Sequence, residues 1–271
     1  MIRSVRLITS INALIIALQL SVSPAAGATG KATDAFDAAN LLYEKGKFVE
    51  AVEAYESLIA GGTRTAPLLF NLGNAYYKTE ETGLAISSWL QAESLAPRNE
   101  RIQINLDFAR NAVGGGATPL PRWQDLLKRF TLNEWTGVVL STSWLFFGGL
   151  ALGVWRPKWR PPLRLAVLIG GVLFVVSTAL LIITARDRAE TVVAVVTVEE
   201  AVIRFGPLKE SQSAFVARDG TEFRAIDFKE DWIRVIDSTD REGWLTSDQV
   251  ILLRGGRPLV ESDQPDTSGT N

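Results

Sequence analysis

Two uncharged runs organise this 271-residue chain: residues 135–155, WTGVVLSTSWLFFGGLALGVW, and residues 165–185, LAVLIGGVLFVVSTALLIITA. Each run contains 21 residues, so at ~1.5 Å per residue each makes a helix of about 31 Å, which matches a hydrocarbon core of ~30 Å. A helical hairpin buried in a soluble core is the alternative, but the rest of the chain is too small to cover two wholly apolar helices. The runs therefore predict two transmembrane helices.

The segment between the runs, RPKWRPPLR at residues 156–164, holds four basic residues and no acidic one. Short loops with an excess of Lys and Arg stay on the cytoplasmic side of a membrane. We therefore expect this loop in the cytoplasm and both flanking soluble parts on the exported side.

The N-terminus supports the same orientation. Arg3 and Arg6 precede a mainly apolar stretch, residues 7–20, and an Ala-x-Ala pattern ends at Ala28. This order is typical of a secretory signal peptide. An uncleaved anchor helix is the alternative, although residues 7–20 are short for a span. We expect residues 1–28 to be a signal peptide that exports the segment after it.

Residues 32–65 and 66–99 are two copies of one pattern with a period of 34 residues. The recurring positions are Phe36, Asn40, Tyr43, Ala51 and Tyr55 in the first copy and Phe70, Asn74, Tyr77, Ala85 and Trp89 in the second. With Gly73 also in place, the second copy resembles the tetratricopeptide repeat, a pair of antiparallel helices. The resemblance implies α-helical repeats over residues 31–111, closed by a capping helix at 100–111.

The same resemblance implies a groove that binds a peptide. In tetratricopeptide repeats the first helix of each pair faces the concave side of the array. Asn side chains there can bond an extended backbone, and aromatic rings can contact its side chains. The concave positions include Glu44 and Phe108. The candidate peptide-binding residues are Phe36, Asn40, Tyr43, Phe70, Asn74, Tyr77, Lys78 and Arg101. An ordinary core role is the alternative for each of them, and the outside of the array is a second candidate partner surface.

After residue 189 the sequence changes to short runs of Val, Ile, Phe and Trp between turn residues, which is typical of β-strands. We expect strands at 191–197, 221–226, 232–236, 243–246 and 250–253. Five short strands in about 65 residues predict a small closed barrel. The segment AVIRFGP at 201–207, followed by Gly220 and by Gly243-Trp244-Leu245, resembles the bacterial SH3-like domain.

Two interpretations of the aromatic residues in this all-β module stay open. Trp232 and Trp244 are expected in the barrel core or at its rim, because a small domain needs large apolar side chains. The functional alternative is a surface for a peptide or a glycan. Its candidate residues are Arg204, Phe205, Phe228 and Trp232.

The composition restricts the possible chemistry. The chain has no Cys and no His, so disulfides, thiol nucleophiles, His-based triads and His or Cys metal sites are excluded. Because 28 basic residues balance 30 acidic ones, a nucleic-acid partner is not expected. The acidic residues are scattered rather than paired. We therefore expect no enzymatic activity, no cofactor and no metal.

The order of these modules resembles the BatE-type proteins of the Bacteroides-aerotolerance family. The resemblance implies a multidomain protein of the bacterial cytoplasmic (inner) membrane that binds membrane proteins with von Willebrand A domains and works with a MoxR-type ATPase in stress tolerance. We accordingly expect a non-enzymatic scaffold that binds proteins on the periplasmic side. A peptidoglycan-binding envelope protein is the alternative.

The expected domain boundaries follow from these arguments. They are a signal peptide (1–28), repeats (31–111), a linker with an interfacial segment (112–134), a first span (135–155), a cytoplasmic loop (156–164), a second span (165–185), an SH3-like domain (189–254) and a disordered tail (255–271).

Overall fold

A computed structural model describes residues 29–114, 127 and 129–259 of the chain. One compact unit includes Leu132–Ala185, and a second combines Lys31–Thr131 with the segment that begins at Arg186. The expected signal peptide, most of the linker and the end of the tail lie outside the described residues.

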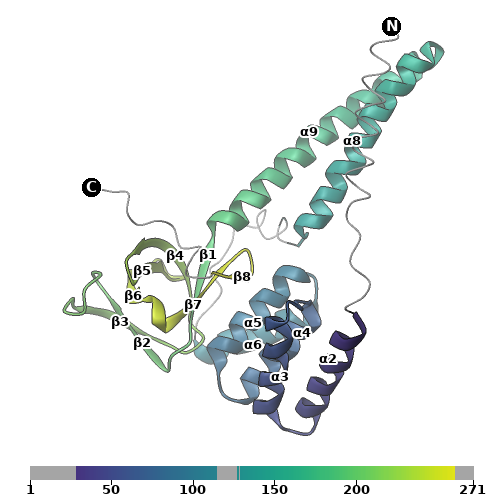
Figure 1. Ribbon diagram of the computed structural model, residues 1–271. Helices are drawn as coiled ribbons and strands as arrows, with labels where there is room; N and C mark the ends of the chain where they lie inside the picture. Colours follow the sequence, from purple (N-terminus) through teal and green to yellow (C-terminus); the bar gives the residue numbers. More distant parts are fainter. Residues whose placement is uncertain (1–28, 115–126, 128, 260–271) are drawn as a thin grey trace. The chain divides into compact units, whose positions relative to one another are not determined.

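Two long apolar helices form the first unit and lie side by side as a hairpin (Figure 1). They are α8 (Leu132–Trp155) and α9 (Arg160–Glu190), joined by the short 3-10 helix η1 (Pro157–Trp159). Both are long and apolar enough to cross a membrane. Most of their large apolar side chains are exposed, which is the arrangement expected for helices that face lipid.

Small residues let the two helices approach closely. A Cβ at Gly149 would lie 2.8 Å from the side chain of Val167, and one at Gly170 would lie 3.3 Å from the backbone N of Phe146. The hydroxyls of Thr142 and Ser177 lie 3.0 Å apart. Gly149 and Gly170 therefore allow the backbones of α8 and α9 to pack closely, as small residues also do between membrane helices.

Five helices, each antiparallel to the next one along the chain, open the second unit (Figure 1). They are α2 (Thr29–Glu44), α3 (Phe48–Ala60), α4 (Ala66–Lys78), α5 (Thr82–Leu95) and α6 (Glu100–Val113). Thr65 caps α4 by accepting a bond from Leu68 N at 3.3 Å, and Asn99 caps α6. Gly114, with φ of 70°, ends α6 in the left-handed conformation that glycine adopts most easily.

The interior of this helical array contains Trp89 and Tyr55, both almost fully buried. A Cβ at Gly73 would lie 2.5 Å from Nε1 of Trp89 and 3.0 Å from the carbonyl O of Ala85, so only glycine fits where α4 crosses α5. The small residues at 73 and 85 thus allow the close helix crossing.

An antiparallel sheet of eight strands completes the second unit, in the order β3-β2-β6-β5-β4-β1-β7-β8. The strands are β1 (Val192–Val196), β2 (Glu200–Arg204), β3 (Ser213–Arg218), β4 (Glu222–Lys229), β5 (Trp232–Ile236), β6 (Glu242–Thr246), β7 (Val250–Arg254) and β8 (Arg257–Pro258). Ile203, Phe223, Ile233 and Leu245 are among its buried core residues.

The expected closed five-strand barrel is not what the chain forms. All five expected strands are present, as β1, β4, β5, β6 and β7, but β2, β3 and β8 extend the sheet and its ends stay unpaired in the described residues. The edge strand β8 has only two residues, and one of them, Pro258, has no N–H to donate. The sheet is therefore open.

The sheet packs on α5. Val195 of β1 and Leu253 of β7 belong to the same buried core as the helices. On α5, the polar residues Ser87, Ser88 and Gln91 are 2%, 3% and 7% exposed. Part of the outer side of the helical array, a candidate partner surface from the sequence, is therefore covered by the protein's own sheet.

An aspartate from the sheet caps α5. Oδ1 of Asp219, in the β3–β4 turn, accepts a hydrogen bond from the backbone N of Gly83 at 3.0 Å. The residue before the helix, Glu81, makes no side-chain cap of its own. Burial raises the pKa of Asp219, while bonds from the backbone N–H groups of Gly83, Thr82 and Gly220 oppose that shift. The first turn of α5 thus depends on a residue 136 positions away.

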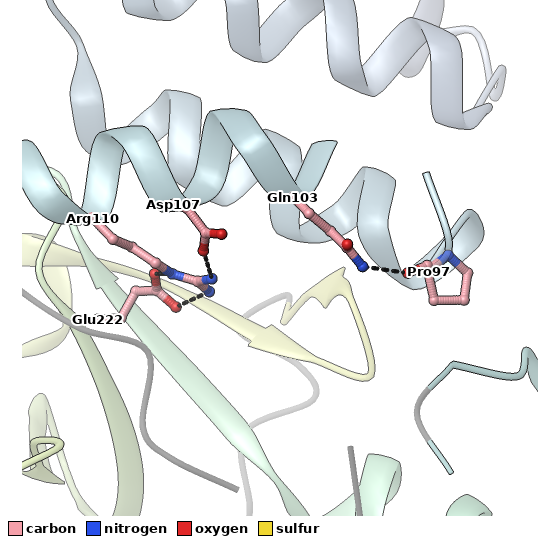
Figure 2. Close-up of polar contacts among 5 residues, drawn as sticks. All are labelled: Pro97, Gln103, Asp107, Arg110 and Glu222. Carbon is pink, nitrogen blue, oxygen red and sulfur yellow. Dashed lines mark hydrogen bonds and ion pairs between the residues drawn. The ribbon is translucent and has the colours of Figure 1, made fainter. Parts of the chain in front are cut away.

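A two-pronged ion pair joins α6 to β4 (Figure 2). Arg110 donates from Nε to Oε1 of Glu222 at 2.6 Å and from Nη2 to Oε2 at 3.0 Å. Nη1 of Arg110 also lies 3.9 Å from Oδ1 of Asp107. Two turns earlier in α6, Nε2 of Gln103 donates to the carbonyl O of Pro97 at 2.9 Å (Figure 2). Helices and sheet therefore form one unit held by polar as well as apolar contacts.

Candidate functional site

The candidate peptide-binding residues lie on three neighbouring helices and form what we term the α2–α4–α6 face. Its members are Phe36, Asn40 and Tyr43 on α2, Phe70, Asn74, Tyr77 and Lys78 on α4, and Arg101 on α6. On α2 and α4 the first three members are spaced i, i+4 and i+7, which places them on one side of each helix. Side-chain hydrogen bonds join α2 to α4 and α4 to α6.

Two asparagines organise this face in the same way. Oδ1 of Asn40 accepts bonds from Oη of Tyr55 at 2.7 Å and from Nδ2 of Asn71 at 2.9 Å. Oδ1 of Asn74 accepts bonds from Nε1 of Trp89 at 3.2 Å and from Nδ2 of Asn105 at 2.8 Å. The two networks differ by 34 positions at every member, so the sequence repeat is also a repeat of contacts.

These bonds fix the orientation of each amide. Oδ1 of Asn40 and of Asn74 has both lone pairs occupied, so the remaining polar group of each side chain is its NH₂, a pure donor. Within the described residues neither NH₂ has a protein partner. Two fixed amide donors one repeat apart can bond the carbonyl oxygens of an extended segment.

Aromatic rings flank the two asparagines. Tyr77 lies 5.8 Å from Trp89 and 5.9 Å from Phe108, measured between ring centroids. Phe36 lies 6.1 Å from Tyr55 in the first copy. Burial raises the pKa of Tyr43, so its hydroxyl stays protonated and can donate at neutral pH. Each ring therefore rests partly on the core and partly on the open side of the array.

The two cations of the face lie at opposite ends of it. Lys78 is in the last turn of α4, and Arg101 is in the first turn of α6. The pairs Asn74–Asn105 and Tyr77–Phe108 share one sequence offset, so α4 and α6 run parallel and these cations do not come together. Both side chains are exposed.

One apolar residue of α6 is missing from the sequence prediction. Ile104 is 63% exposed, beside Phe108 at 61%. Its spacing of i+3 from Arg101 and i−4 from Phe108 is the signal that would have identified it. These two exposed apolar side chains add apolar surface to the α6 part of the face.

The structure separates the four candidate residues of the sheet. Arg204 on β2 pairs with Trp244 on β6, and Trp244 pairs with Arg234 on β5. Trp232 lies two residues before Arg234 and therefore points to the same side of the sheet. We term the side that carries Arg204, Trp232, Arg234 and Trp244 the outer sheet face. Phe228 instead pairs with the buried Ile233 and packs against the sheet core. Phe205, 66% exposed, follows the end of β2.

Trp232 and Trp244, expected in the core or at its rim, do not lie in the core of the sheet. Both are only half-buried, whereas Phe223 and aliphatic residues such as Ile233 and Leu245 fill the interior. The reason is alternation along the strand, because Trp232 stands next to Ile233 and only one of two successive residues can face the core.

The two arginines of the outer sheet face are held by hydrogen bonds. Arg204 donates from Nη1 to the carbonyl O of Ser211 at 2.8 Å, and Arg234 donates to Glu242 at 2.5 Å.

Neither surface has the donor set of a metal site. In the part of the chain that the structure describes, no three acidic side chains gather closely enough to hold an ion. The donors of the α2–α4–α6 face are amide, hydroxyl and ammonium groups, which suit hydrogen bonding to a backbone. No protein-family model matches this chain, and no curated protein is detectably similar to it.

Proposed function

We propose that this protein is a non-enzymatic, membrane-anchored scaffold that captures an extended protein segment on its α2–α4–α6 face. The observation that carries the proposal is the pair of asparagine networks. The side-chain oxygen of Asn40 and of Asn74 accepts hydrogen bonds inside the fold, so the NH₂ group of each is held in a fixed orientation. Fixed donors lose little conformational entropy when they bind. The half-exposed rings beside them supply apolar contacts for the side chains of the segment.

The contact repeat also supports the finer assignment of the helices. A set of three residues, an amide acceptor with two donors, recurs with the 34-residue period that is typical of tetratricopeptide repeats. For the sheet module, five strands at the expected positions support an SH3-like assignment. In this proposal the open edge of the sheet is a departure from that pattern.

The polar contacts within the second unit bear on membrane topology. Arg110 precedes the apolar hairpin in the chain and Glu222 follows it, yet they form an ion pair. Two crossings return a chain to the side on which it started, so α8 and α9 as a pair of spans are compatible with that contact. The basic loop at 156–164 then favours the cytoplasm for the bend and the periplasm for the second unit.

In this proposal the protein belongs to the bacterial cytoplasmic membrane and acts in a stress-tolerance complex of the BatE type. Its partners are protein segments, with membrane proteins that carry von Willebrand A domains as the first candidates. The module order described from the sequence supports this assignment.

The capture function is testable with substitutions that preserve the internal bonds. In the Asn40→Asp, Asn74→Asp double variant each side chain keeps an oxygen for its two internal donors but presents a second oxygen in place of NH₂. We expect capture of partner proteins from detergent-solubilised membranes to fall by roughly tenfold or more, because two hydrogen bonds are lost and each carboxylate oxygen then faces a carbonyl oxygen, another acceptor. Quantitative mass spectrometry of the captured proteins measures the effect.

A matched control separates capture from folding. Val49→Ala, Glu53→Ala and Ser57→Ala together alter exposed positions of α3, away from the face. This control should retain wild-type capture. If the aspartate variant captures the same proteins in the same amounts as the wild type while unfolding at the same temperature, the α2–α4–α6 face is not the binding surface.

A wall-binding function is the second candidate, and the outer sheet face favours it. Two half-exposed indoles beside two arginines form a surface that can stack on sugar rings and bond their substituents. The variant Trp232→Ala, Trp244→Ala should lower co-sedimentation of the full chain with cell-wall sacculi by about tenfold or more. Leu208→Ala, at another exposed apolar position, should not. Absence of wild-type co-sedimentation would exclude this function.

A further inference from the structure

A groove of about 950 Å³ lies between α8 and α9. Its lining is almost wholly apolar, with Phe146 and Leu150 on α8 and Val172 and Val175 on α9 among the residues that form it. The two exceptions are Arg160 and Arg164, both at the end of the groove next to the loop. The groove thus combines a long apolar part with one cationic end.

The groove has the reach of one lipid chain. On α9 its lining begins at Arg160 and ends at Val176. Sixteen residue steps correspond to about 24 Å of helix. Half of a ~30 Å hydrocarbon core is ~15 Å, so the groove extends at least through one leaflet.

Among the residues that the structure describes, the two arginines of the groove have no acidic partner. No Asp or Glu occurs anywhere from residue 135 to residue 186. Nε of Arg160 donates to the carbonyl O of Gly153 at 2.9 Å, which holds the side chain at the groove end, and both arginines are exposed. Their remaining guanidinium N–H groups have no partner within the described residues. A guanidinium matches the geometry of phosphate oxygens and binds them with paired hydrogen bonds.

We propose that this groove binds one anionic phospholipid, with its phosphate at Arg160 and Arg164 and an acyl chain between α8 and α9. The inference rests on the proposed membrane anchoring. Charge complementarity selects this occupant, because an apolar helix or a second copy of the hairpin would fill the apolar part but bring no anion to the arginines. Basic pockets between membrane helices next to a cytoplasmic loop are suited to such headgroups.

The test is lipid binding to the full chain in detergent, followed by native mass spectrometry during titration with phosphatidylglycerol or phosphatidylcholine. The wild type should bind one phosphatidylglycerol in preference to phosphatidylcholine. The Arg160→Gln, Arg164→Gln variant should lose roughly thirtyfold in phosphatidylglycerol affinity, from ~1 kcal/mol for each arginine. The control Arg156→Gln, Lys158→Gln removes the same charge from the same loop but outside the groove, and should stay within about threefold of the wild type.

A second pair of variants tests the apolar part. Val172→Trp places a larger side chain at a groove-lining position, whereas Leu173→Trp makes the same change at its neighbour, which does not line the groove. Only the first should weaken phosphatidylglycerol binding. If Val172→Trp leaves phosphatidylglycerol binding unchanged, the site is limited to the arginines and the proposed position of the acyl chain is wrong.

Three further results would overturn the lipid site. They are equal binding of the two lipids, equal loss in both charge variants, and a dimer in which a second copy competes with phosphatidylglycerol. A separate vesicle flotation assay reports on the anchoring itself. If the full chain floats with vesicles but shows no lipid preference, the lipid site fails and the anchoring stands. If it does not float with vesicles of either lipid, the anchoring fails.

Discussion

Replacement of Arg110 by alanine should lower the free energy of unfolding of the helix–sheet unit by about 3–5 kcal/mol, because it leaves Glu222 without its cation in a largely buried position. The side chains of Arg110 and Glu222 are 15% and 10% exposed. Burial alone would lower the pKa of Arg110, and its bonds to Glu222 raise it above the ordinary value. The pair is therefore coupled, and removing one member exposes the desolvation cost of the other.

The control for this prediction removes both charges. In Arg110→Met, Glu222→Leu no buried charge is left unpaired, so stability should return to within about 1–2 kcal/mol of the wild type. Denaturant unfolding of the full chain in detergent, followed by tryptophan fluorescence, measures both variants. A loss for Arg110→Ala no larger than that of an exposed ion pair, below ~1 kcal/mol, would contradict the structural role of this bond.

Gly83→Ala should have the second largest effect. In an isolated helix this change is favourable by ~1 kcal/mol, because glycine is a poor helix former. Here a Cβ at position 83 would lie 2.0 Å from the carbonyl O of Val196 and 2.5 Å from Oδ1 of Asp219. Since one of these atoms is backbone, the sheet must move away from α5. We expect a net destabilisation of at least ~2 kcal/mol.

Hydrogen exchange of the full chain locates this effect. In Gly83→Ala the amides of α5 and β1 should exchange faster than in the wild type, because the packing between them is loosened. Gly61→Ala is the matched control, since a Cβ there would meet only the carbonyl oxygens of Ser57 and Leu58, at 3.4 and 3.5 Å. Unchanged protection of α5 in Gly83→Ala would show that the sheet does not need this close approach.

Local periodicity is what made part of the fold predictable. The 34-residue repeat identifies helix pairs because each pair reuses the same small and aromatic positions, and the alternating runs identify five of the strands. The 34-residue repeat also places Asn40 and Asn74 on one face of the helical array. The bonds that orient their amides are not visible from the pattern alone, although Asn71 and Asn105 carry the same spacing.

Contacts between distant segments leave no such signal. Ser87 and Ser88 are polar and indicate a solvated side of α5, yet both are almost fully buried. Asp219 is an ordinary turn residue in the sequence, and its role as the cap of α5 depends on an approach across 136 positions. The size of Trp232 predicts a position in the core or at its rim, and the strand's two-residue period gives the core side to its neighbour Ile233.

The cap of α5 by Asp219 also sets an order of events during biosynthesis. A nascent chain leaves the ribosome with Gly83 long before the β3–β4 turn, and α8 and α9 are made in between. During that interval the first backbone N–H groups of α5 can hydrogen-bond only to water, because the aspartate that caps them has not yet been synthesised. A chain that ends before the sheet therefore contains α2 to α6 but leaves the first turn of α5 without the Asp219 cap.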